Sequence, residues 1–73
     1  MNNLLISIIM PVYNAEKWII NAVQAIQNQT YKFWELILID DGSVDETLKL
    51  CKECSKLDER ITVYSQENKG PSA

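Results

Sequence analysis

Three apolar runs rich in β-branched residues alternate with two segments of helical periodicity, and this order constrains the fold more than any other feature. The runs cover residues 4–10, 34–39 and 61–64. Strands that alternate with helices favour a parallel sheet joined by right-handed crossovers. The chain is therefore predicted to be α/β, with the order β-α-β-α-β of a partial Rossmann-like sheet.

The first run is nearly unbroken and is expected to end at Pro11. Continuous apolar runs are typical of strands that are covered on both faces. Three strands, however, leave an open edge on each side, and two helices are few for covering both faces of a sheet. We therefore expect more chain, or a partner subunit at the open edges, to complete the sheet, with residues 1–73 as a part that is incomplete at its C-terminal end.

Both helical segments carry start signals. Asn14 is expected to cap a helix of residues 16–28, in which Glu16 suits the positive end of the helix dipole. Ser43 and Glu46 have the spacing of a capping box, so a second helix is expected to begin there. The apolar positions that define the two helices are Ile19, Ala22, Val23 and Ile26 in the first, and Thr47, Leu50, Cys51 and Cys54 in the second.

Length and charge exclude several classes of protein. Seventy-three residues make at most one small domain, and 47% hydrophobic content argues against disorder. The net charge is -3 and the basic residues are scattered, which disfavours nucleic-acid binding. No apolar stretch approaches the roughly 20 residues of a membrane span, and the N-terminus lacks the features of a signal peptide. A cytoplasmic location is expected, with any membrane association supplied by chain outside this segment.

Cys51 and Cys54 have the Cys-x-x-Cys spacing of a redox pair or of half a zinc site. A structural zinc needs four ligands, and the chain has no His and no second cysteine pair. We expect two small apolar side chains on the buried side of a helix, and no metal held by this segment.

Two loops follow the carboxyl ends of the first two strands, where open parallel sheets bind ligands. If the strands are neighbours, residues 11–14 and 40–43 meet. Tyr13 then offers an aromatic face to a base, and Asp40 or Asp41 accepts a hydrogen bond from a base or a ribose.

Each of these residues also has a structural interpretation. Tyr13 on its own is more often a packing residue. Asp40 to Ser43 is also a turn followed by a helix cap, although two adjacent carboxylates cost stability unless a cation or a polar ligand uses them. Glu16 has a role at the helix start that is at least as well supported as a role in binding.

Four blocks of sequence together carry a family resemblance. They are residues 6–14, 25–31, 35–47 and 68–73. The third block contains the Asp40-Asp41-Gly42-Ser43 motif. In order, spacing and residue type the chain resembles the start of family 2 glycosyltransferases. Val44 departs mildly, since the family often has Thr at this place.

The resemblance implies the N-terminal half of a GT-A fold that transfers a sugar from a nucleoside diphosphate, commonly UDP, to a saccharide or lipid-linked hydroxyl acceptor with inversion. By position, Pro11, Val12 and Tyr13 line the base pocket and Asp40 or Asp41 holds uracil or ribose, with Glu16 a weaker candidate. The family's Asp-x-Asp motif for Mg²⁺ or Mn²⁺ and its general base lie outside these residues, so no catalytic residue is predicted here, and the segment alone is expected to be inactive.

Other classes fit less well. A receiver domain has paired acids after its first strand, whereas these follow the second. A dinucleotide-binding oxidoreductase needs Gly-x-Gly-x-x-Gly, which is missing. A non-catalytic nucleotide-sugar binding module remains an alternative, because a fold alone does not confer activity.

Overall fold

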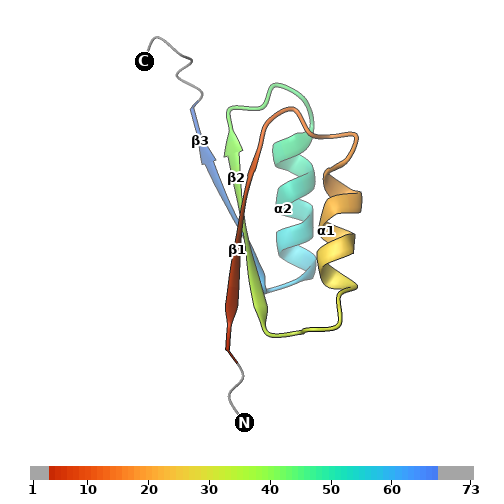
Figure 1. The fold of residues 1–73 in the computed structure, drawn as a ribbon. Coiled ribbons are helices and arrows are strands. Elements are labelled where there is room, and N and C mark those ends of the chain that lie inside the picture. Colours follow the sequence, from red (N-terminus) through yellow and green to blue (C-terminus); the bar gives the residue numbers. More distant parts are fainter. Residues whose placement is uncertain (1–3, 68–73) are drawn as a thin grey trace.

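The computed structural model describes residues 4–67, which form three parallel strands and two helices in strict alternation (Figure 1). The strands are β1 (Ile6–Val12), β2 (Trp34–Asp41) and β3 (Ile61–Gln66), and the helices are α1 (Ile19–Gln27) and α2 (Thr47–Leu57). The sheet order is β1-β2-β3, with both neighbouring pairs parallel. This confirms the predicted α/β class and element order.

The two helices lie side by side on one face of the sheet (Figure 1). Two crossovers of the same hand that advance in the same direction across a sheet place both helices on the same face. The strand β2 shows the consequence in its burial, because alternate residues from Trp34 to Asp40 are fully buried and those between them are half-buried.

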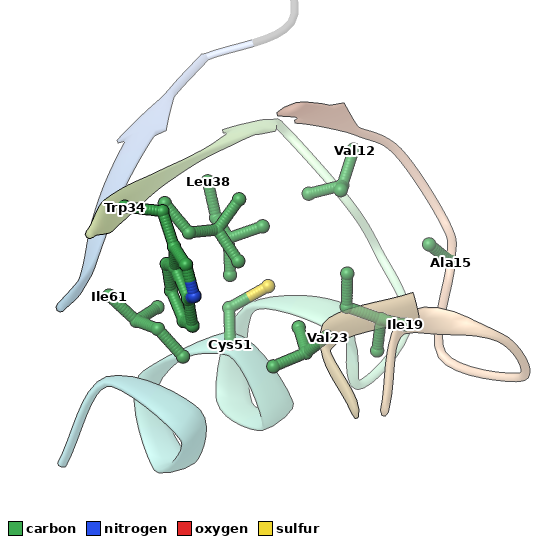
Figure 2. Packing of buried hydrophobic residues seen from close by; sticks show 9 residues of the cluster. Val12, Ala15, Ile19, Val23, Trp34, Leu38, Cys51 and Ile61 are labelled. Atoms are coloured by element: carbon green, nitrogen blue, oxygen red, sulfur yellow. The ribbon is translucent and has the colours of Figure 1, made fainter. Parts of the chain in front are cut away.

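The core lies between this helical layer and the sheet (Figure 2). Trp34 and Leu38 project from β2 toward the helices, and Ile19, Val23 and Cys51 project back from them (Figure 2). Leu36, between Trp34 and Leu38 on the same face of β2, is also fully buried. At roughly 1.5–3 kcal/mol for each large aliphatic side chain, burial of this set is the main stabilising contribution.

The other face of the sheet has no covering layer among residues 4–67. Ile9 is 63% exposed and Tyr64 59% exposed, and between them Ile37 and Ile39 are half-buried. The expectation that the first strand is covered on both faces is therefore wrong for the part of the chain that the structure describes. The apolar run of the first strand shows that the side chains on both of its faces are apolar, but not that both faces are covered.

Pro11 lies inside β1 and does not end it, contrary to the sequence prediction. The N–H of Ile6 donates to the carbonyl of Phe33, so even-numbered residues of β1 direct their amides toward β2. Pro11, an odd position, faces the free edge, where a missing N–H costs no ladder hydrogen bond.

Candidate functional site

The loops that follow β1 and β2 lie next to each other at the carboxyl edge of the sheet (Figure 1). Val12 pairs with Asp40 in the strand register, and the N–H of Asn14 donates to the hydroxyl of Ser43 at 2.9 Å. The prediction that these two distant segments meet is confirmed.

The strand register divides the predicted site residues between the two faces of the sheet. Val12 is 2% exposed and Asp40 is 1% exposed, and both side chains lie on the helix side. Pro11 and Asp41 lie on the open face, because successive side chains alternate along a strand. A ligand over the open face therefore meets the side chains of Pro11 and Asp41, but only backbone groups of Val12 and Asp40.

Tyr13 follows the last residue of β1 and is 50% exposed. Its ring is not part of the buried core cluster. Tyr13 lies one residue beyond the register pair of Val12 and Asp40, at the edge of the sheet where β2 ends at Asp41.

Asp41 is half-buried, and its Oδ1 accepts a hydrogen bond from the Gln66 side-chain amide at 3.2 Å. Gln66 is the register partner of Asp41 on β3. The sequence pattern did not single out Gln66, because it becomes a neighbour of this carboxylate only through strand pairing. The second carboxylate oxygen of Asp41 accepts no hydrogen bond from residues 4–67.

Asp40 shapes the turn instead. Its Oδ2 accepts from the backbone N–H of Ser43 at 3.2 Å, and Gly42 between them takes a left-handed conformation with φ 75. Its other oxygen is buried and has no hydrogen-bond partner among residues 4–67. The two adjacent aspartates therefore differ in environment, and only Asp41 faces the open side.

Glu16, the weakest of the predicted site residues, points its carboxylate across to the second loop. Its Oε1 accepts from the backbone N–H of Glu46 at 2.8 Å. The capping box predicted for Ser43 and Glu46 is wrong. The Ser43 hydroxyl accepts from the N–H of Asn14, and the N–H of Glu46 donates to Glu16. The helix α2 begins at Thr47, whose N–H donates to Asp45 at 2.9 Å.

The predicted start of the first helix is also wrong. Asn14 has a positive φ of 48 and is not an N-cap, and α1 begins at Ile19 after a turn in which Trp18 and Ile19 donate to the carbonyl of Ala15. Asn14 instead accepts from the N–H of Val44 at 3.0 Å.

Both cysteines lie on α2, as predicted, with Cys51 fully buried and Cys54 half-buried. Burial, with the nearby Cys54 and Asp40, raises the pKa of the Cys51 thiol to about 11. Burial and Glu53 also raise the pKa of Cys54. Raised thiol pKa values are the opposite of what a redox pair needs.

Two further features bear on ligands. In residues 4–67, no three His, Cys, Asp or Glu side chains gather closely enough to hold a metal ion. A hollow of about 470 Å³ lies on α2 and contains none of the predicted site residues; it is lined by Leu48, Lys49, Lys52, Glu53 and Lys56.

Neither α1 nor α2, the helices of the described part, is long and apolar enough to cross a membrane.

Comparison with known proteins decides the family. The family model described as Glycosyl transferase family 2 matches residues 7–73. This chain belongs to glycosyl transferase family 2. Its membership sets aside the receiver-domain and dinucleotide-oxidoreductase alternatives, and it agrees with the three-stranded Rossmann-like arrangement of the structure.

Relatives in several bacteria share the same segment. GlyG, a glycosyltransferase of Streptococcus pneumoniae, is 44% identical over 94% of this chain, which corresponds to 23% of GlyG. TuaG of Bacillus subtilis, a putative teichuronic acid biosynthesis glycosyltransferase, is 42% identical over 90% of this chain and 27% of TuaG. An uncharacterised glycosyltransferase of Rickettsia conorii is 42% identical over the whole chain, which spans 12% of it. The chain thus spans roughly an eighth to a quarter of these three family members.

The block at residues 68–73 that contributed to the resemblance lies outside the described residues, although the family match extends over it.

Proposed function

We propose that this family 2 chain binds the nucleotide of a nucleoside-diphosphate sugar, with UDP as the first candidate, for transfer of the sugar to a saccharide or lipid-linked hydroxyl with inversion. One observation carries the proposal. Tyr13, just after β1, and Asp41, the last residue of β2, stand at the carboxyl edge of the sheet, with the Tyr13 ring 50% exposed and one Asp41 carboxylate oxygen free of protein partners in the described residues.

The chemistry of a uracil nucleotide fits this pair. Uracil has a flat face and an N–H donor, and a ribose has two hydroxyl donors. A phenol ring provides stacking, and a carboxylate is the strongest acceptor that a side chain offers. Pro11 adds an apolar surface next to Ile39 on the same face. Asp41 is therefore the side chain we assign to the nucleotide, and Asp40 the one that holds the turn.

Binding the nucleotide does not complete a transferase. We expect a divalent cation, Mg²⁺ or Mn²⁺, and a general base to be supplied by chain beyond this segment. No three His, Cys, Asp or Glu side chains of residues 4–67 gather closely enough to hold a cation, and no step of this proposal passes through a metal held here. The 73-residue segment by itself is expected to transfer no sugar, and a full-length protein that binds UDP without transfer would be the non-catalytic binding module.

Thermal unfolding of the full-length protein with UDP and MnCl₂ tests the proposal, because a ligand that binds only the folded state raises the melting temperature. We expect a rise with UDP that is absent in Asp41→Ala. Glu35→Ala is the matched control, since Glu35 is a half-buried acid on the same face of β2 at its opposite end. A protein without any UDP-dependent rise, or an Asp41→Ala variant that keeps it, would overturn the assignment.

A further inference from the structure

The two loops of the site are joined by hydrogen bonds that run in both directions. Three backbone donors of the first loop are bound by side chains of the second: Asn14 by Ser43 at 2.9 Å, Ala15 by Thr47 at 2.6 Å, and Glu16 by Asp45 at 3.3 Å. Two backbone donors of the second loop are bound by side chains of the first: Val44 by Asn14 at 3.0 Å, and Glu46 by Glu16 at 2.8 Å. We call this set the reciprocal loop bonds.

These bonds hold the segments that lead into the two helices. The residues at the N-caps of α1 and α2, Trp18 and Glu46, make no side-chain capping hydrogen bond. Unpaired amides at a helix start cost free energy when they are shielded from water. Backbone amides ahead of each helix are thus bound by side chains of the opposite segment, so that opening one segment leaves donors of the other without partners.

Asp45 and Thr47 form the centre of the reciprocal loop bonds. The carboxylate of Asp45 accepts from the Thr47 N–H, the Thr47 hydroxyl and the N–H of Glu16. The Thr47 hydroxyl, fully buried, also accepts from Ala15. Asp45, two residues before α2 begins, and Thr47, the first residue of α2, therefore bind two amides of the first loop.

The reciprocal loop bonds begin one or two residues after the residues assigned to the nucleotide. Tyr13 adjoins Asn14, and Asp41 is two residues before Ser43. We propose that Asp45 and Thr47 are positioning residues that set the separation of Tyr13 and Asp41 and thereby the affinity for the donor nucleotide. This inference rests on the proposed function, and neither residue is assigned a contact with the nucleotide.

The test uses the full-length protein, UDP as the probe, and Asp45→Asn. An Asn side chain keeps one oxygen that can accept from Thr47. Its NH₂ group, which replaces the second carboxylate oxygen, cannot accept the hydrogen bond from the N–H of Glu16. Asp58→Asn is the matched control: Asp58 also accepts from a backbone N–H two residues later, that of Arg60 at 3.0 Å, but beside the amino end of β3. Calorimetric titration gives the UDP affinity of both variants at a temperature where each is folded.

We expect Asp45→Asn to weaken UDP binding by about fivefold or more, the lower end of measured coupling between sites, and Asp58→Asn to leave it unchanged. Thr47→Val should act like Asp45→Asn, whereas Thr47→Ser, which restores the hydroxyl, should recover most of the affinity. Equal weakening by Asp45→Asn and Asp58→Asn, or no weakening by Asp45→Asn, overturns the positioning role.

Amide hydrogen exchange without UDP separates this inference from the proposed function. Asp45→Asn should accelerate exchange at Glu16 and also at Val44, whose partner lies on the other loop. If the unmodified protein binds no UDP, the proposed function fails and the positioning role fails with it. Faster exchange at both amides in Asp45→Asn would still demonstrate that the two loops are coupled. Unchanged exchange at Val44 overturns the coupling itself.

Discussion

Asp40 and Asp41 are adjacent in the chain, yet their carboxylates lie on opposite faces of β2. Asp40 is 1% exposed beneath the helices and binds the amide of Ser43, whereas Asp41 is half-buried on the open face and binds the Gln66 amide. Alternation along a strand separates a turn-forming acid from the acid that we propose binds the nucleotide. Mutations of the two should therefore have different consequences.

Asp40→Ala is expected to lower the free energy of unfolding by about 1–3 kcal/mol, because it leaves the Ser43 amide without its acceptor. Asp41→Ala should change the stability little and weaken UDP binding by roughly ten- to a hundredfold, the value of a hydrogen bond to a charged group. Urea unfolding and calorimetric titration of the full-length variants measure the two effects. Interchanged phenotypes would contradict the assignment.

Tyr13→Ala is expected to reduce UDP affinity by about 1–3 kcal/mol, the usual contribution of an aromatic ring stacked on a base. Tyr13→Phe should retain most of the affinity, since stacking needs the ring and not the hydroxyl. Because the side chain is 50% exposed, neither change should shift the melting temperature without UDP appreciably. If Tyr13→Ala unfolds the protein and Tyr13→Phe abolishes binding, the ring is a packing residue and its hydroxyl is the ligand group.

Asp58 should make stability depend on acid pH. Its carboxylate accepts from the Arg60 guanidinium at 2.8 and 3.0 Å and from Gln27 at 3.1 Å, and these bonds hold the pKa of Asp58 well below its usual range, against the opposing effect of partial burial. A folded-state pKa below the unfolded value of about 3.9 means that the carboxylate stabilises the fold at neutral pH.

That stabilisation is lost as the pH falls below about 5 and toward the folded-state pKa. We expect Asp58→Asn to be less stable than the unmodified protein at pH 7 and to lose less stability between pH 5 and pH 2. Urea midpoints across this range measure the difference. Parallel pH profiles for the two proteins would show that the ion pair with Arg60 is not responsible.

The thiols of Cys51 and Cys54 should be inert in the folded protein. Burial and neighbouring charge raise the pKa of both, that of Cys51 to about 11, so the reactive thiolate is scarce at pH 8. A thiol-reactive dye should label both cysteines only after denaturation. Rapid labelling of the native protein, or an oxidised pair under mild oxidants, would restore the redox interpretation.

The element order and the meeting of the two loops could be predicted from sequence, because each rests on short-range pattern. The run of residues 34–39 predicts a strand on apolar content alone, and parallel strands bring their carboxyl ends to one edge. The apolar run of β1 could not show that Ile9 is exposed on an open face, since its pattern is the same whether or not a layer covers it.

The helix starts were predicted wrongly for a common physical reason. Asn14, Ser43 and Glu46 were assigned to caps of their own helices, and each is bound instead to the other loop. Local capping rules consider partners three residues apart, whereas these pairs are separated by 29–30 residues. Only the strand register, which brings Val12 beside Asp40, makes such partners available.

A crystal structure of the full-length protein with UDP and Mn²⁺ tests the central claim most directly. We expect the uracil ring against Tyr13 on the open side of the sheet, with the Asp41 carboxylate accepting from the base or the ribose and Asp40 still bound to Ser43. A nucleotide bound elsewhere, for instance over the α2 hollow, with Tyr13 and Asp41 free of it, would contradict the claim.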